Sequence, residues 1–218
     1  MIQYLIDNID LKTYGVRVSD TEGLFDLPKM KKPLSVNWPD RHGEQVDVSQ
    51  VRFEPRDITI SCYMIAQGRT EFLIRVNEFA AGLLMSTGLK QLVVVYDSNK
   101  PLTYMVYMPD GLNIKRSTKW NAARHTGVFE LKLREPEPVK KVLRFTALTG
   151  NMQVSLAFAS NRQVTVHWGN KKSTATNTPS VSLTHTYQVA GTYYIVLTGV
   201  IEDINNLVTN ATIIWELI

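Results

Sequence analysis

The stretch from residue 56 to residue 108 constrains the fold of this chain more than any other part of the sequence. Residues 56–65 alternate apolar and polar side chains, which predicts a β-strand with one buried face and one wet face. The apolar residues that follow recur at helical spacing, which predicts an amphipathic helix over residues 70–86, capped by Thr70 and ended by Gly88. Such a helix must bury its apolar face against a sheet, so this unit is the predicted centre of the N-terminal part of the chain.

Short strands are predicted on both sides of this unit. Residues 1–6 and 14–18 are expected to form an opening hairpin. Residues 19–50 are rich in proline and polar side chains, which indicates long loops with one strand near residues 34–38. After the helix, turn residues separate two apolar runs, which predicts a second hairpin. The runs of this hairpin and the later strand candidates cover residues 92–96, 102–108, 112–119 and 127–134.

The segment Glu135-Pro136-Glu137-Pro138 predicts a domain boundary, because two prolines interleaved with charge cannot continue a sheet. Domains are therefore expected over residues 1–138 and 139–218. The second of these has few charged residues and no sustained helical period, which predicts an antiparallel β-sandwich. The fold class is thus mainly β, with an α+β N-terminal domain. The strand candidates of the sandwich cover residues 142–147, 153–159, 163–168, 181–187, 192–198 and 211–217.

Composition argues against several classes of function. Cys62 is the single cysteine, so it is expected to be a small buried side chain, with no intrachain disulfide and no cysteine-based metal site. The net charge of +4 is modest, and the basic residues are not interleaved with aromatic ones, which argues against nucleic-acid binding. Asp7 and Asp10 interrupt the N-terminal stretch where a signal peptide would be apolar, and no apolar run approaches the roughly 20 residues that span a bilayer. We therefore expect a chain made in the cytoplasm, with no membrane insertion.

No sequence motif indicates catalysis. The chain has no glycine-rich phosphate loop, no nucleophile elbow and no His-Glu-x-x-His helix, and no motif places two carboxylates together. We therefore expect neither enzymatic activity nor a cofactor.

The C-terminal part carries three short motifs. These are Val164 to Asn170 with Trp168-Gly169, then Thr184-His185-Thr186-Tyr187, and then Gly191-Thr192-Tyr193. Together they resemble the signature of PKD-like β-sandwich domains. The resemblance implies a structural motif made of Trp168, Gly169, His185, Tyr187, Gly191 and Tyr193.

These motifs allow functional interpretations beside a structural one. Asn170-Lys171 replaces the Asp-Gly of the PKD-like turn, and acidic residues are scarce, which argues against a calcium site. His185 is expected to be a hydrogen-bonded structural histidine, because no second histidine stands at ligand spacing. Trp168, Tyr193 and Tyr194 could form a surface on which sugars stack, although sandwich cores use the same residues.

The order of elements in the first 138 residues resembles that of the distal tail proteins of long-tailed bacteriophages. A polar loop, Asp40-Arg41-His42-Gly43-Glu44, precedes the strand that begins at Arg56-Asp57. The helix over residues 70–86 ends in a Thr87-Gly88 turn, and a hairpin follows up to residue 107. The resemblance implies a β-barrel-like ring subunit with one flanking helix, hexameric rings that join the tail tube to the tip, and a variable C-terminal domain.

The first functional hypothesis is a structural component of a phage or prophage tail tip. Its partners would be further copies of the chain in a hexameric ring, the tail tube and the baseplate proteins, and its place would be the virion tail, assembled in the cytoplasm of the bacterial host. The C-terminal domain would be an interaction or adhesion module for a host-surface glycan or protein. Subunit contacts are assigned to Arg41, His42, Arg75 and Glu78; for the loop of Arg41 and His42 the alternative, which spacing alone favours, is a surface bend. The alternative is a carbohydrate- or protein-binding surface module without catalytic activity, against which the missing export signal counts.

Overall fold

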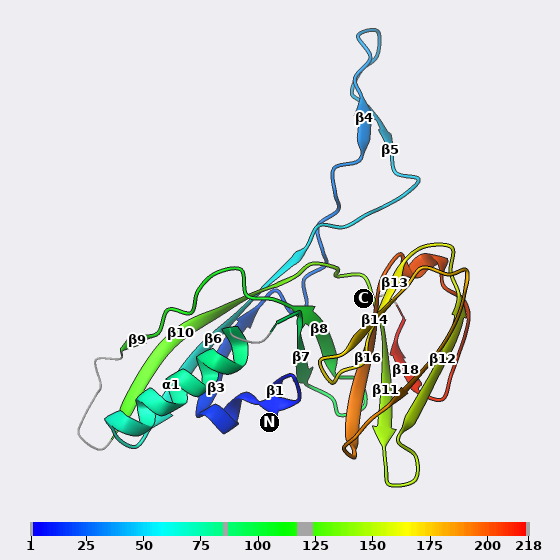
Figure 1. The fold of residues 1–218 in the computed structure, drawn as a ribbon. Helices are drawn as coiled ribbons and strands as arrows, with labels where there is room; N and C mark the ends of the chain where they lie inside the picture. Colours follow the sequence, from blue (N-terminus) through cyan, green and yellow to red (C-terminus); the bar gives the residue numbers. More distant parts are fainter. Residues whose placement is uncertain (1, 85–86, 117–123, 217–218) are drawn as a thin grey trace.

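A computed structural model, which describes residues 2–84, 87–116 and 124–216, shows two β-rich halves side by side and a long arm that projects from the N-terminal half (Figure 1). The described part of the chain contains one α-helix and two short 3-10 helices among many antiparallel strands. The expected fold class, mainly β with one helix in the N-terminal half, is confirmed.

The N-terminal half holds two four-stranded antiparallel sheets. Their strand orders are β2-β1-β7-β8 and β3-β6-β10-β9. The long strands β6 and β10 pair along their whole length, from Arg56 opposite Glu135 to Ala66 opposite His125. The strands are β1 (Gln3–Ile6), β2 (Ile9–Asp10), β3 (Val16–Glu22), β6 (Arg56–Ala66), β7 (Lys90–Val95), β8 (Leu102–Val106), β9 (Lys115–Arg116) and β10 (His125–Glu135). The predicted hairpin of residues 92–108 is confirmed as β7 and β8.

The predicted opening hairpin is wrong, because β1 and β3 lie in different sheets. The chain turns at Asp7 and Asn8, both with positive φ, into the two-residue strand β2. A 3-10 helix, η1 (Leu11–Tyr14), then leads to Gly15, whose φ of 71° reverses the chain into the second sheet. The side chain of Asp10 caps η1 by accepting a hydrogen bond from the Lys12 N–H at 2.9 Å. This local turn chemistry, absent from the apolar pattern, carries the chain from one sheet to the other.

Helix α1 (Arg69–Leu84) lies along β6 and β10, as the amphipathic pattern predicts (Figure 1). Its buried Phe79 ring lies 5.5 Å from the ring of Phe129 on β10. The predicted cap at Thr70 is wrong, because the helix already begins at Arg69. Instead the Glu71 carboxylate accepts a hydrogen bond from the Gln67 N–H at 2.6 Å. Residues 85–86 of the predicted helix lie outside the described residues, as do residues 1, 117–119 and 217 of three predicted strands.

A glycine on the sheet allows the close approach of the helix. A Cβ added at Gly127 would lie 2.8 Å from the Phe72 ring of α1 and 2.8 Å from the Ile114 side chain. The small helix residue Gly82 instead lies next to Tyr14, whose hydroxyl would be 3.2 Å from an added Cβ. Close packing of the helix therefore depends on small residues from both partners.

The C-terminal half is a two-sheet sandwich. Its sheets have the strand orders β14-β13-β16-β11-β18 and β15-β12-β17. The strands are β11 (Lys141–Ala147), β12 (Gln153–Ala159), β13 (Val164–His167), β14 (Ser173–Thr176), β15 (Ser180–Thr186), β16 (Gly191–Gly199), β17 (Asn205–Thr209) and β18 (Thr212–Trp215), with the 3-10 helix η2 (Ile201–Asp203) before β17. Strands β14 and β17 were not predicted; both are edge strands that are rich in Ser, Thr and Asn, and at least half of their side chains are exposed.

Replacement of Gly127 by alanine should destabilise the N-terminal half by about 1–3 kcal/mol, because the added methyl group would overpack the contact between Phe72 and the sheet. Gly111→Ala is the matched control, since an added Cβ there meets nothing within 4 Å. Urea unfolding of both variants measures the effect. Equal midpoints for the two variants would contradict the proposed packing constraint.

Candidate assembly surfaces

The arm is a β-hairpin that leaves the body between β3 and β6 (Figure 1). Its outer part pairs β4 (Leu34–Val36) with β5 (Gln45–Asp47). Nearer the body the two legs are joined by main-chain hydrogen bonds from Lys31 N–H to Arg52 and from Glu54 N–H to Lys29, each 2.7 Å long. Two predictions for this segment are thus corrected in detail: residues 19–22 extend β3, and the strand near residues 34–38 is one half of a hairpin.

Apolar side chains of the arm point into solvent along its whole length. No residue from 25 to 55 is buried. Leu27 is 92% exposed and Leu34 is 73% exposed. The other exposed apolar side chains of the arm are Phe25, Met30, Val36, Trp38, Val46, Val48 and Val51. An isolated two-stranded hairpin is at best marginally stable in water, so this segment gains most from a surface that covers it.

The residues predicted for subunit contacts fall into two separate places. Arg41 and His42 are exposed at the tip of the arm, and Arg75 and Glu78 lie on α1, far from the tip (Figure 1). Arg75 is already engaged within the chain, since it donates a hydrogen bond to the Ile65 carbonyl at 2.8 Å and pairs with Glu71 at 2.6 Å. Sequence reasoning missed the exposed Leu73 and Ile74 on the outer face of α1, which break the amphipathic pattern.

The two halves share a hydrophobic cluster. Met105 of β8 packs with Val142 of β11, Val196 of β16 and Ile214 of β18. Hydrogen bonds surround this cluster, from the Gln91 side-chain amide to the Tyr194 carbonyl at 2.7 Å and from the Trp215 indole N–H to the Pro101 carbonyl at 2.9 Å. The outer face of sheet β2-β1-β7-β8 therefore packs against the sandwich.

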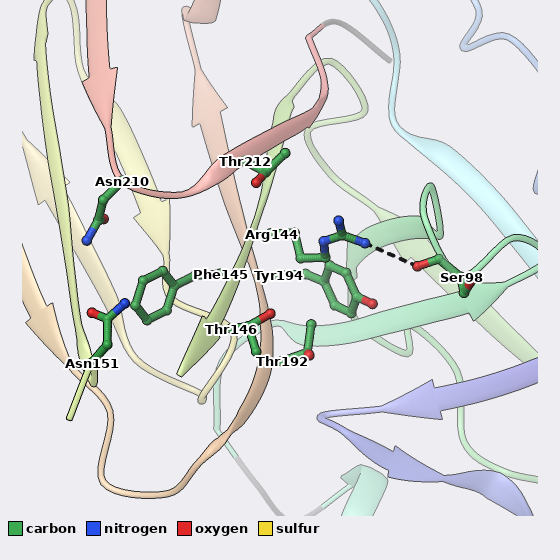
Figure 2. A pocket seen from close by; sticks show the side chains of 9 residues that line it. All are labelled: Ser98, Arg144, Phe145, Thr146, Asn151, Thr192, Tyr194, Asn210 and Thr212. Carbon is green, nitrogen blue, oxygen red and sulfur yellow. Dashed lines mark hydrogen bonds between the residues drawn. The ribbon is translucent and has the colours of Figure 1, made fainter. Parts of the chain in front are cut away.

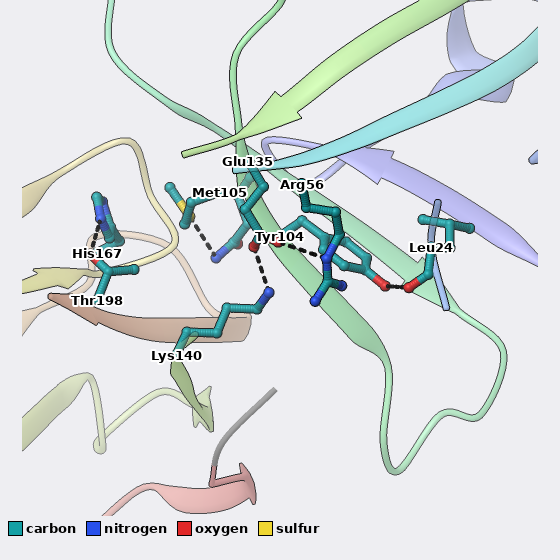
Figure 3. A network of polar contacts seen from close by, with 9 residues as sticks. Leu24, Arg56, Tyr104, Met105, Glu135, Lys140, His167 and Thr198 are labelled. Carbon is teal, nitrogen blue, oxygen red and sulfur yellow. Dashed lines mark hydrogen bonds and ion pairs between the residues drawn. The ribbon is translucent and has the colours of Figure 1, made fainter. Parts of the chain in front are cut away.

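A network of buried charges lies beside this cluster, where the chain passes from β10 to β11 (Figure 3). The carboxylate of Glu135 accepts a hydrogen bond from the Lys140 ammonium at 2.5 Å and faces the Arg56 guanidinium at 3.6 Å. Both cations also lie over the ring of Tyr104, whose hydroxyl donates to the Leu24 carbonyl at 2.6 Å. Glu135 and Lys140 are 0% and 1% exposed.

Burial and attraction act against each other in this network. Burial raises the pKa of Glu135 and lowers the pKa of Lys140, and the attraction between the two groups opposes both shifts. Neither ion has water as an alternative partner, so each depends on the other to stay charged. The segment between Glu135 and Lys140 is held at both ends by this contact.

Glu135→Gln should destabilise the protein by about 3–5 kcal/mol, because it leaves two buried cations without a counter-charge. Glu130→Gln is the matched control on the same strand, since its side chain is 60% exposed and lies 3.9 Å from Lys132; its effect should stay within about 0.5 kcal/mol. Guanidinium unfolding followed by circular dichroism gives both values. A change of less than about 1 kcal/mol for Glu135→Gln would show that the network does not hold the halves together.

The aromatic residues of the motif lie together as two stacked pairs, joined by an edge contact between the rings of His185 and Tyr187 at 4.9 Å. The rings of Trp168 and His185 are stacked at 4.7 Å, and the rings of Tyr187 and Tyr193 are stacked at 3.8 Å. The Tyr187 hydroxyl donates a hydrogen bond to the Trp168 carbonyl at 2.8 Å. The His185 Nε2 atom lies 2.9 Å from the Asn170 side-chain amide nitrogen.

The two glycines of the motif lie in different elements: Gly191 in a strand and Gly169 in a turn. Gly191 opens β16. Gly169 has a φ of 76°, and a Cβ there would lie 2.7 Å from the Tyr194 carbonyl oxygen, so the close approach of the β13–β14 turn to β16 requires glycine. Asn8 donates a hydrogen bond to the Gly169 carbonyl at 3.2 Å. The turn thereby also contacts the N-terminal half.

Acidification should weaken the sandwich. Burial lowers the pKa of His185, with a smaller effect from Lys172, and burial also lowers the pKa of His167. The unfolded chain therefore binds protons more tightly at these residues, so stability falls as the pH falls through about 6.5. Urea midpoints at pH 7.5 and 5.5 measure the loss. His185→Phe keeps a ring for stacking on Trp168 and should show a smaller loss than the wild type; an unchanged loss would remove His185 as a cause.

A polar cleft of about 320 Å³ lies between the β7–β8 turn and the outer face of the large sandwich sheet (Figure 2). Arg144 of β11 and Tyr194 of β16 form its centre, and Ser98 belongs to the turn. Burial raises the pKa of Tyr194, which the guanidinium of Arg144 partly offsets. The other lining residues are Phe145, Thr146, Asn151, Thr192, Asn210 and Thr212.

Two further classes of site are absent from residues 2–84, 87–116 and 124–216. In these ranges no three His, Cys, Asp or Glu side chains gather closely enough to hold a metal ion. No helix in them combines the length and the apolar character needed to cross a bilayer. Cys62 is buried, and burial raises the pKa of its thiol to about 12.

Comparison with protein-family models gives no match, and comparison with curated proteins gives none either. Among solved structures, the chain is similar to the crystal structure of the SPP1 Dit protein (gp 19.1), described as a paradigm of the hub adsorption apparatus in phages that infect Gram-positive bacteria. The identity is 11% and the TM-score is 0.48, and the match covers 91% of this chain and 98% of the SPP1 protein.

Proposed function

We propose that this protein is a structural component of a phage or prophage tail tip, a hub that joins the tail tube to the baseplate. The exposed arm is the observation that carries the proposal. A segment with no buried residue between positions 25 and 55 and with many apolar side chains in solvent is suited to an assembled state, in which another surface covers it. The order of elements that resembles distal tail proteins supports the choice of this assembly over others.

The partner that we propose for the arm is a further copy of the same chain in a hexameric ring. The charges of the arm balance. Its basic residues are Lys29, Lys31, Lys32, Arg41 and Arg52, and its acidic residues are Asp26, Asp40, Glu44, Asp47 and Glu54. Such a surface fits a partner of no strong charge, held by apolar contacts. Arg41 and His42 at the tip, and Glu78 with Leu73 and Ile74 on α1, are the proposed contacts with neighbouring copies or tail proteins.

We propose that the two halves are separate domains with different roles, each built around its own hydrophobic cluster. One includes Phe79 and Leu131 in the N-terminal half, and the other includes Phe145 and Trp168 in the sandwich. These separate clusters support a boundary near Pro138. The N-terminal domain would form the ring, without catalysis, and the PKD-like sandwich would be a peripheral interaction module for a glycan or protein of the host surface.

Removal of apolar side chains from the arm should abolish self-association. We expect the purified wild-type chain to form particles larger than the monomer, in amounts that rise with concentration in light scattering. Electron microscopy should show these particles as hexameric rings. Leu27→Ser combined with Leu34→Ser should give a monomer with an unchanged circular dichroism spectrum, because the arm contributes no buried residue to the body.

The matched control replaces two exposed valines of the sandwich, Val189 and Val208, by serine. It removes a similar amount of exposed apolar surface outside the arm and should leave the rings intact. A wild-type chain that stays monomeric at every concentration, alone and with tail proteins, would refute the proposed role. Rings that persist in the arm variant would place the contact elsewhere.

A further inference from the structure

We propose that the cleft between the β7–β8 turn and the large sandwich sheet binds a sugar unit that carries an anionic group, a carboxylate or a phosphate. The inference rests on the proposed interaction role of the sandwich, but it does not depend on ring formation, which involves the arm. Four observations on the cleft support it: its charge, its free hydrogen-bonding groups, its ring and its position.

The charge of the cleft comes from Arg144 alone. No carboxylate is among the lining residues, and within the described part of the chain Arg144 has no ion pair. Its Nη1 atom donates only long hydrogen bonds, 3.4 Å to the Ser98 carbonyl and 3.5 Å to the Asn99 carbonyl. These contacts hold the guanidinium in the cleft and leave most of its donors for a ligand (Figure 2). A planar guanidinium matches the oxygen pairs of a carboxylate or phosphate.

The walls of the cleft offer hydroxyl groups. Thr146, Thr192 and Thr212 are exposed, and among the described residues their hydroxyls have no hydrogen bond with the rest of the chain. The hydroxyl of Tyr194 is likewise without such a bond there. These groups both donate and accept, as the hydroxyls of a sugar do. The lining amide of Asn210 is already used within the chain, through bonds to Ser155 and Gln153.

The ring of Tyr194 gives the cleft an apolar element beside its charge. The Tyr194 side chain is half-buried, packs against the Met105 cluster and lies next to Arg144 (Figure 2). The carbon face of a sugar ring would lie against its outer part while the anionic group reaches the guanidinium. A volume of about 320 Å³ suits one such unit. A nucleic acid would require more than one cation, and an apolar peptide would not use the three threonine hydroxyls.

The position of the cleft favours a preformed site. One wall is the turn after β7 and the other is a sheet, and the two are joined by the Met105 cluster and by the Trp215 hydrogen bond to Pro101. The distance between Ser98 and Arg144 therefore does not depend on the ligand. Ligand sites occur preferentially at such junctions between domains.

Calorimetric titration of the full chain tests the proposal with four probes: D-glucuronate, D-glucose 6-phosphate, D-glucose and inorganic phosphate. We expect saturable binding of at least one charged sugar, and the tighter of the two identifies the anionic group. Glucose and phosphate should each bind at least about tenfold more weakly, because each lacks one half of the recognised chemistry. Glucose or phosphate binding as tightly as the charged sugars would overturn the proposal, and so would no saturable binding of either charged sugar.

Two variants locate the site. Arg144→Gln should lower the affinity for the charged sugar at least about tenfold, because a hydrogen bond to an ion is lost. Thr192→Val should lower it by a smaller factor and keeps the charge. The control is Arg162→Gln, which removes an exposed arginine paired with Asp203 at 3.3 Å, outside the cleft. If the Arg144→Gln variant binds the charged sugar as tightly as the control variant does, the assignment is overturned. Light scattering on the same samples reports ring assembly separately.

Discussion

The buried contact of Glu135 with Lys140 and Arg56 is the interaction on which the arrangement of the two halves depends. Each of these ions would cost several kcal/mol if it were buried alone, so the contact is formed as a whole or not at all. Arg56 opens β6, Glu135 ends β10 and Lys140 precedes β11. Two strands of one N-terminal sheet and the start of the sandwich therefore meet at one carboxylate, beside Tyr104 of the other sheet. Pro136 and Pro138 stiffen the short segment between the ionic partners.

Sheet β2-β1-β7-β8 is a layer shared between two hydrophobic clusters. On one face Leu92 and Val94 pack into the core of the N-terminal half, and on the other Met105 packs against the sandwich. This double burial explains the continuous apolar run of β7, where an alternating pattern would mark a strand with a wet face. It also places the turn after β7 beside Arg144, which creates the cleft.

The arm and the cleft differ in what they require. The arm is held by its main-chain ladder and by a few exposed contacts, such as the ion pair of Arg52 with Glu202 at 3.3 Å, and none of its residues from 25 to 55 is buried, so its apolar side chains gain most when another surface covers them. The cleft is supported on both sides by packed elements and is complete within one chain. The proposed assembly contact therefore lies on a segment of low local stability, and the proposed ligand site lies between packed elements.

Prediction from sequence succeeded where one local pattern decides the structure. The alternation along β6 and β10, the helical spacing around Phe72 and Phe79, and the turn residues between β7 and β8 each predict the observed element. It failed at β14 and β17, because edge strands with polar side chains have no apolar alternation. It also failed at the opening hairpin, because the cap at Asp10 and the glycine at position 15 redirect the chain without any apolar signal.

The sequence by itself determined the fold class, the helix and most strands, since these follow from periodicity and from residues close together in the chain. The tertiary structure alone decided which strands share a sheet, that the arm stands free, and that Arg56, Glu135 and Lys140 meet. It also decided that Ser98 and Arg144 form one cleft. These features depend on contacts between residues far apart in the chain. The local pattern of side chains does not show which of these residues meet, so it cannot predict such contacts.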